Sequence, residues 1–320
     1  MNNKIYLVCL LLFCYCFSPL QALASDETEE LKQVMEDIIE WKKSSIGTTS
    51  ESNLFNNSFL KNAGDTMGDW YPIAMGRLGY SDDYAAYLAV IEDVVEKRYR
   101  TSDKLSDTKS TEWHRISLAI LSVGGDPTQI GIDQSGNTIN LIQDGTYNRG
   151  KTVSLGAQGI NGWVWGLITL DSMRYMIPQD SYYSRDAIIK EILCLQLADG
   201  GFSFYQDVAD ADITAMTLQA LAPYYNSEQV YRYTQQATGK ETIKTVRQVV
   251  DEALETLSSL QTAKGDFKSW DTENAESTAQ VLVALTALGI DPLTDTRFIK
   301  NGKNILDGLY QYKKIGRAHV

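Results

Sequence analysis

The stretch Leu195–Tyr225 reads LQLADGGFSFYQDVADADITAMTLQALAPYY and contains the unit from which the rest of the chain can be understood. An apolar helical stripe ends here, two glycines allow the chain to reverse, and an acidic loop leads into an Ala- and Leu-rich segment with helical spacing. Asp212 and Thr214 stand ahead of this segment and predict first-turn and capping interactions. Pro223 predicts its end, because proline cannot continue a helix. The stretch therefore predicts a helix, a tight turn, an acidic loop and a second helix.

Looser copies of this unit recur along the chain, roughly 45 to 65 residues apart. Apolar helical runs end at four prolines, Pro127, Pro178, Pro223 and Pro292. More amphipathic segments precede several of these runs and predict an outer layer of helices, as over 29–43, from Tyr84 and from Val246. Residues 128–162 lack sustained periodicity and predict loops and short helices, and residues 224–241 form a second long insertion. The pattern predicts an all-α fold of repeated helical hairpins over residues 25–314.

The first 24 residues have the composition of a secretory signal peptide. Lys4 precedes an apolar run, and Ala22–Ala24 forms an A-x-A cleavage site. We therefore expect the protein to be secreted, extracellular or at the cell surface. Cys194 is the one cysteine outside this segment, so no internal disulfide is expected.

The charge and hydropathy of the chain exclude some partners. Its net charge is -12, or -13 once Lys4 has left with the signal peptide, which argues against nucleic acid as a partner. No second apolar run approaches the ~20 residues of a membrane-spanning helix.

The end of the chain departs from the repeat. Residues 301–312 predict another outer helix, after which we expect a glycine turn and a further inner helix. The chain instead ends KKIGRAHV, and Ile315–Val320 matches the translation of a common sequencing adapter. We interpret 315–320 as an adapter-derived tail on a truncated reading frame, with about five of six hairpins complete.

Two elements carry a resemblance to a known superfamily. The Gln, Gly, aromatic element occurs at Gln196 to Phe202 and again at Gln261 to Phe267, and DADITAM (Asp210–Met216) resembles the DxDDTA motif of class II cyclases. The chain thus resembles the α/α toroids of the terpene cyclase and protein prenyltransferase superfamily, with their prenyltransferase and squalene oxidase repeat. This resemblance implies an (α/α)6-type toroid.

A closer resemblance follows from five short segments, GDW, GRLGY, DGGF, TAMTLQALAPY and GIDP. Together they are similar to secreted bacterial toroid proteins related to intrinsic factor and transcobalamin, which often carry a C-terminal β domain. This resemblance implies a corrinoid (cobalamin) as ligand. The β domain is not in the sequence, and we expect that the frame is cut before it.

The candidate site residues stand at the starts of the inner helices. By resemblance to the cyclases, Asp212 occupies the position of the general acid and Asp210 the first position of the motif, whereas Ile213 replaces the third acid. If the inner helices run parallel, their N-termini bring acids and aromatics to one rim. The candidate ligand-binding residues are Asp69, Trp70, Glu112, Trp113, His114, Trp163, Trp165, Phe202 and Glu276.

Three functions remain open at this level. We expect a non-catalytic ligand-binding or surface-interaction module, with a small molecule or glycan as partner and no cofactor other than a bound corrinoid. The alternatives are a class II terpene cyclase-like enzyme and a carbohydrate-active enzyme with paired carboxylates at the barrel mouth. No metal site is expected, because Cys194 and His114 cannot supply the zinc ligands that a prenyltransferase needs. The first-turn acids can equally be explained by the helix dipole, and the tryptophans by core packing.

Overall fold

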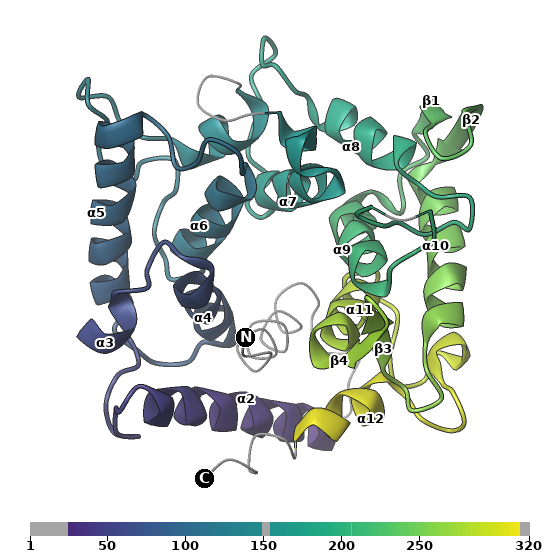
Figure 1. The fold of residues 1–320 in the computed structure, drawn as a ribbon, viewed down its shortest axis with the longest axis horizontal. Coiled ribbons are helices and arrows are strands. Elements are labelled where there is room, and N and C mark those ends of the chain that lie inside the picture. Colours follow the sequence, from purple (N-terminus) through teal and green to yellow (C-terminus); the bar gives the residue numbers. More distant parts are fainter. Residues whose placement is uncertain (1–24, 149–153, 206, 314–320) are drawn as a thin grey trace. The chain divides into compact units, whose positions relative to one another are not determined.

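The structure is a computed structural model that describes residues 25–148, 154–205 and 207–313. The predicted signal peptide, residues 1–24, and the predicted adapter tail, residues 315–320, lie outside the described residues. The described chain separates into two compact units, residues 29–185 and residues 186–313, and residues 25–28 are grouped with the second. Figure 1 labels the helices and strands of both units.

The first unit consists of helices joined by irregular segments. Its elements are α2 (Ser25–Ser45), α3 (Asn57–Leu60), α4 (Thr66–Leu78), α5 (Tyr84–Ser102), α6 (Thr111–Ser122), the π-helix η2 (Gln143–Tyr147), the 3-10 helix η3 (Leu155–Gln158) and α7 (Ile160–Asp171). Helices α4, α6 and α7 are largely buried and pack in sequence order, α4 on α6 and α6 on α7. Helix α5 buries a single stripe at four-residue spacing, Tyr87, Ile91, Val95 and Tyr99. A buried inner layer and an amphipathic outer helix are thus present, as the periodicity predicts.

The second unit repeats this arrangement. Its elements are α8 (Arg185–Cys194), α9 (Ala211–Leu221), the 3-10 helix η4 (Ala222–Tyr224), β1 (Val230–Gln235), β2 (Lys240–Thr245), α10 (Val246–Leu260), β3 (Phe267–Ser269), β4 (Thr272–Asn274), α11 (Ala275–Ala287), the 3-10 helix η5 (Thr296–Phe298) and α12 (Ile305–Tyr310). The two most buried helices, α9 and α11, pack against each other, and α10 packs on α9 from outside (Figure 1). Helix α10 begins with a capping box between Thr245 and Gln248.

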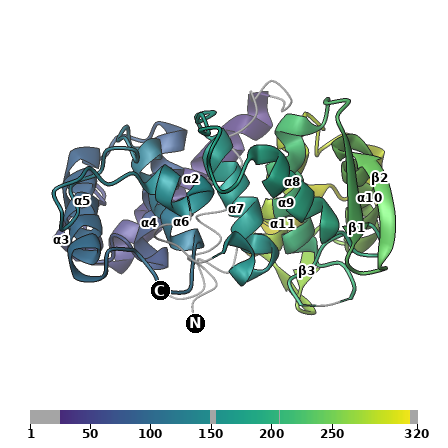
Figure 2. The same cartoon turned by 90° about the horizontal axis from the view of Figure 1, so that it is seen from above.

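The described chain is mostly helical, with two small antiparallel sheets that the sequence analysis missed. Strands β1 and β2 pair from Val230↔Thr245 to Gln235↔Lys240 and lie beside α10 in both views (Figures 1 and 2). Strand β1 alternates exposed and buried side chains, and it buries Tyr231 and Tyr233. The long insertion over residues 224–241 therefore contains strand β1 and the start of strand β2.

Two local predictions were wrong. Helix α7 ends at Asp171, seven residues before Pro178, because Arg174 takes the left-handed backbone conformation with φ 52°. Asp210, and not Asp212 with Thr214, is the N-cap of α9, where its Oδ1 accepts a hydrogen bond of 3.0 Å from the backbone N of Ile213.

Within the described stretches, no helix has both the length and the apolar character that crossing a membrane requires.

Candidate functional site

The starts of α9 and α11 are built in the same way, from the Gln, Gly, aromatic element. Gln196 Nε2 donates to the carbonyl of Gly200 at 2.9 Å, and Gln261 Nε2 donates to that of Gly265 at 3.0 Å. Each amide closes the tight turn that follows the preceding helix. The sequence element is therefore a structural device that fixes the turn.

A threonine then ties each turn to the first turn of its inner helix. The backbone N of Phe202 donates to Thr214 Oγ1 at 2.9 Å, and that of Phe267 donates to Thr278 Oγ1 at 3.0 Å. Both threonines are fully buried. Because the two turns and the two caps correspond, Asp212 and Glu276 occupy the same position, two residues after the N-caps Asp210 and Asn274.

Asp212 and Glu276 differ from their neighbours in exposure and in bonding. Asp212 is the one residue of α9 that is not buried, and Glu276 is the one partly exposed residue between Ala275 and Leu285 of α11. Neither carboxyl group makes a side-chain hydrogen bond or an ion pair with another described residue. Both are therefore available to an external group.

The environment of Asp212 enables its carboxyl group to donate a proton near neutral pH. Burial of its carboxyl group, together with the charges of Asp210 and Glu276, raises the pKa of Asp212 to about 7. Burial also raises the pKa of Glu276, although its own backbone N–H acts in the opposite sense. The helix N-terminus favours an anion here, but burial and the neighbouring carboxylates outweigh it. The pair can thus donate a proton as well as accept hydrogen bonds.

Asp210 is less available than Asp212. Its Oδ1 caps α9, and its Oδ2 accepts a hydrogen bond of 2.7 Å from Ser269 Oγ at the end of β3. This bond attaches the β3–β4 hairpin to the start of α9. The next residue, Trp270, is 64% exposed at the tip of that hairpin.

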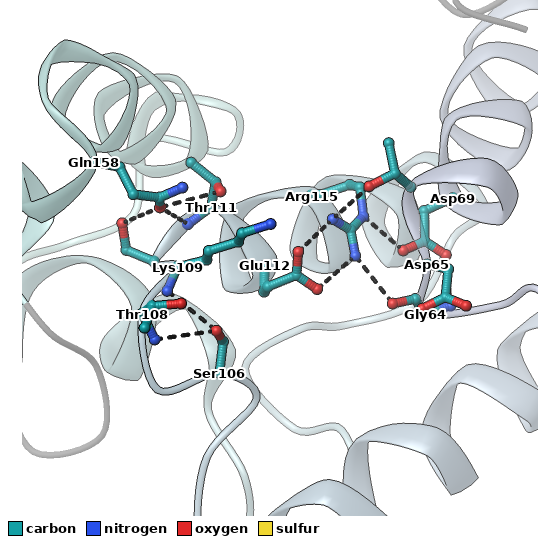
Figure 3. Close-up of polar contacts among 12 residues, drawn as sticks. Gly64, Asp65, Asp69, Ser106, Thr108, Lys109, Thr111, Glu112, Arg115 and Gln158 are labelled. Atoms are coloured by element: carbon teal, nitrogen blue, oxygen red, sulfur yellow. Dashed lines mark hydrogen bonds and ion pairs between the residues drawn. The ribbon is translucent and has the colours of Figure 1, made fainter. Parts of the chain in front are cut away.

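In the other unit, the predicted acids Asp69 and Glu112 are engaged inside the protein. Asp69 is fully buried and accepts hydrogen bonds from Arg115 Nε at 2.9 Å, the backbone N of Gly64 at 2.7 Å and Tyr87 Oη at 2.9 Å. The Arg115 guanidinium also holds both oxygens of Glu112 at 2.8 Å, so it lies between the two acids (Figure 3). Burial opposes ionisation of Glu112, but Arg115 and Arg98 hold its pKa below the usual range. These acids join α4 to α6.

The side chains of Trp113 and His114 are also internal. Trp113 is fully buried and donates to Tyr99 Oη at 2.8 Å. His114 is 1% exposed, and its Nε2 lies 2.8 Å from the carbonyl oxygen of Gly145 in η2, to which it donates. Burial lowers the pKa of His114 to about 4, so the imidazole is neutral at physiological pH.

The remaining aromatic candidates fall into two groups. Trp70 and Trp165 are partly exposed and meet edge to face, with ring centroids 5.5 Å apart. Trp163 is buried against Tyr183, and Phe202 is part of the core of the second unit. The structure thus brings Trp70 to Trp165, and separately brings Asp210 and Asp212 to Glu276.

Sequence reasoning missed four residues of this region: Gln219, Ser269, Trp270 and Gln280. Gln219 lies seven residues after Asp212, and Gln280 lies four residues after Glu276. Helical spacing therefore places each amide on the face of its helix that carries the acid. The signal that could have found the two glutamines is their position between apolar residues, in LQA of α9 and AQV of α11.

The sequence matches no family model, no curated protein and no solved structure. Within the part of the chain that the structure describes, no group of three or more His, Cys, Asp or Glu side chains could hold a metal ion.

Proposed function

We propose that the protein is a secreted, non-catalytic module that binds a small molecule or glycan at the starts of α9 and α11. The observation that carries this proposal is the carboxyl pair of Asp212 and Glu276. Both residues are partly exposed, and neither carboxyl group is used by another described side chain. Stability does not account for the pair, because burial and the charges of Asp210 and Glu276 disfavour the ionised form of Asp212.

We further propose that the two units are parts of an (α/α)6-type toroid of the terpene cyclase and protein prenyltransferase superfamily. The repeated Gln, Gly, aromatic turns before α9 and α11 support this, as do the buried inner and amphipathic outer helices of each unit. The predicted signal peptide belongs to the same proposal.

A corrinoid is the ligand that the resemblance implies. His114, the one histidine in the described part of the chain, is 1% exposed, so an imidazole bond to cobalt is not what this chain offers. The groups that fit a corrinoid are Asp212 and Glu276, which could contact its amide side chains. A glycan would use the same carboxyl groups.

Titration of the purified protein with cyanocobalamin and with neutral oligosaccharides tests the proposal. Saturable binding should weaken at least tenfold in Asp212→Ala and in Glu276→Ala. The matched control is Asp180→Ala, an exposed acid in the other unit. Binding that is equally strong in all three variants would contradict a site at the carboxyl pair.

A second candidate function is acid catalysis by Asp212. It is favoured by the pKa of about 7, which is suited to proton donation near neutral pH, and by a second carboxyl group beside it. Such a protein would be a class II cyclase-like enzyme or a carbohydrate-active enzyme. Product formation from squalene, geranylgeranyl diphosphate or oligosaccharides, abolished in Asp212→Asn, would establish it. No turnover together with saturable binding would favour the binding module.

A further inference from the structure

Two buried glutamine side chains lie on the same helix faces as the carboxyl pair and lack partners. Gln219 is 4% exposed, and neither its Oε1 nor its Nε2 has a hydrogen-bond partner among the described residues. Gln280 is 6% exposed, and its Oε1 likewise has none. Buried amides are normally satisfied, because leaving them unpaired costs their hydration without return. Two unpaired amides on the same helix faces as two unpaired acids indicate that a polar ligand, absent from the structure, pairs with these groups.

The four groups form a polar stripe along α9 and α11. Gln280 lies one turn beyond Glu276, and Gln219 lies two turns beyond Asp212. Seven residues of α-helix rise about 10.5 Å, so the stripe is about as long as a disaccharide. A compact ion would not reach from one end to the other.

The chemistry of the stripe favours a hydroxyl-rich ligand. A ligand hydroxyl group can both donate and accept a hydrogen bond, so it can pair with the side-chain amides, which also do both. It can also donate to a carboxylate or accept from a protonated Asp212. An isoprenoid would leave both amides unpaired, and an anionic sugar would be repelled by the neighbouring carboxylates.

An exposed aromatic side chain lies near one end of the stripe. Trp270 follows Ser269, whose hydroxyl group is bonded to Asp210 at the start of α9. A large exposed aromatic face of this kind can pack on the apolar face of a pyranose ring.

We infer that the site takes a neutral oligosaccharide, with Gln219 and Gln280 as the residues that determine this specificity. This inference rests on the proposed binding function. It concerns the ligand class and requires no catalysis.

Calorimetric titration with cellohexaose, N-acetylated chitohexaose and xylohexaose tests it, alongside cyanocobalamin and geranylgeraniol. At least one hexaose should bind. Its affinity should fall at least tenfold in Gln219→Leu and in Gln280→Leu, and severalfold in Trp270→Ala. Gln134→Leu is the matched control, because this exposed glutamine lies in the other unit.

Thermal unfolding of the same variants separates binding from folding. If the amides serve the ligand, Gln219→Leu and Gln280→Leu should unfold at the wild-type temperature or above, because each removes an unpaired polar group from the interior. Lower unfolding temperatures with unchanged hexaose affinity would overturn the inference.

The other outcomes are also decisive. Binding of cyanocobalamin or geranylgeraniol alone, lost in Asp212→Ala and Glu276→Ala, would overturn the ligand class and leave the proposed function standing. Hexaose binding unaffected by Asp212→Ala and Glu276→Ala would overturn the proposed site. Failure of all five probes to bind would overturn both.

Discussion

Asp212 shows how a single position can serve a ligand at the expense of stability. Its ordinary pKa is 3.8, and burial beside Asp210 and Glu276 raises it to about 7 in the folded protein. Between these values the unfolded chain has already ionised while the folded protein still holds the proton. The folded state therefore binds more protons over this range, and its stability must fall as the pH rises.

The first prediction concerns this pH dependence. From pH 4 to about 7 the contribution of Asp212 to the free energy of unfolding should fall and then level off, by roughly 1.4 kcal/mol for each unit by which the pKa of Asp212 is raised. In Asp212→Asn this contribution should be absent, so the variant should be the more stable protein at pH 8. Urea unfolding at pH 5 and pH 8 measures this, with Asp180→Asn as control. An Asp212→Asn variant that is less stable at pH 8 would contradict it.

Arg115 presents the opposite case, an ionic cluster in which every charge has a partner. Arg115→Leu leaves Asp69 buried without a counterion, so we predict a loss of about 3–5 kcal/mol in the free energy of unfolding. Arg232→Leu removes an exposed pair with Glu241 and should cost less than about 1 kcal/mol. Urea unfolding measures both variants. Equal losses of unfolding free energy would show that the buried cluster stabilises the fold no more than the exposed pair does.

At the scale of elements, the two threonine bonds should determine how firmly the inner helices are attached. Thr214→Val and Thr278→Val each leave a backbone N–H without its acceptor, so each should cost about 1–3 kcal/mol. Thr217→Val is the matched control, because Thr217 is equally buried but bonds only to the carbonyl of Ile213 in its own helix. Urea unfolding of the three variants measures the difference. If Thr217→Val lowers the free energy of unfolding as much as the other two variants, the loss comes from replacing a buried threonine and not from breaking the bond to the turn.

The elements also show what sequence reasoning could and could not supply. Helices α5 and α10 begin at Tyr84 and Val246, where the apolar stripes predict them, because a periodic pattern over four turns is a strong signal. The β1–β2 hairpin was missed although Tyr231 and Tyr233 alternate with polar residues, since six residues at the edge of a helical repeat are weak evidence for a strand.

The sequence predicts the two acids of the site but not its two glutamines, and the reason is physical. Asp212 and Glu276 stand in first turns, a position that the sequence reveals. Whether an acid there has a partner depends on residues far away in the chain. Arg115, 46 residues from Asp69, fills that role in one unit, and the described residues supply no counterpart for Asp212. The unpaired state of Gln219 and Gln280 likewise becomes visible only in three dimensions.

At the scale of the whole molecule, the proposed toroid predicts cooperative behaviour. If neighbouring hairpins of the proposed toroid stabilise one another, urea should unfold the chain in a single transition. Arg115→Leu in one unit and Thr278→Val in the other should then both shift the midpoint of that transition. Fluorescence and circular dichroism can follow it together. Two transitions, each sensitive to one variant, would contradict a toroid that unfolds as one cooperative unit.

The proposed site requires Asp212 and Glu276 to form one carboxyl pair without a partner among the described residues. Carbon-detected NMR titration of aspartate- and glutamate-labelled protein measures this most directly. The account predicts an aspartate carboxyl group that titrates near pH 7, whose signal is lost in Asp212→Asn and whose pKa falls in Glu276→Gln. If every aspartate titrates near pH 4 and Glu276→Gln changes none of them, the pair does not exist as described.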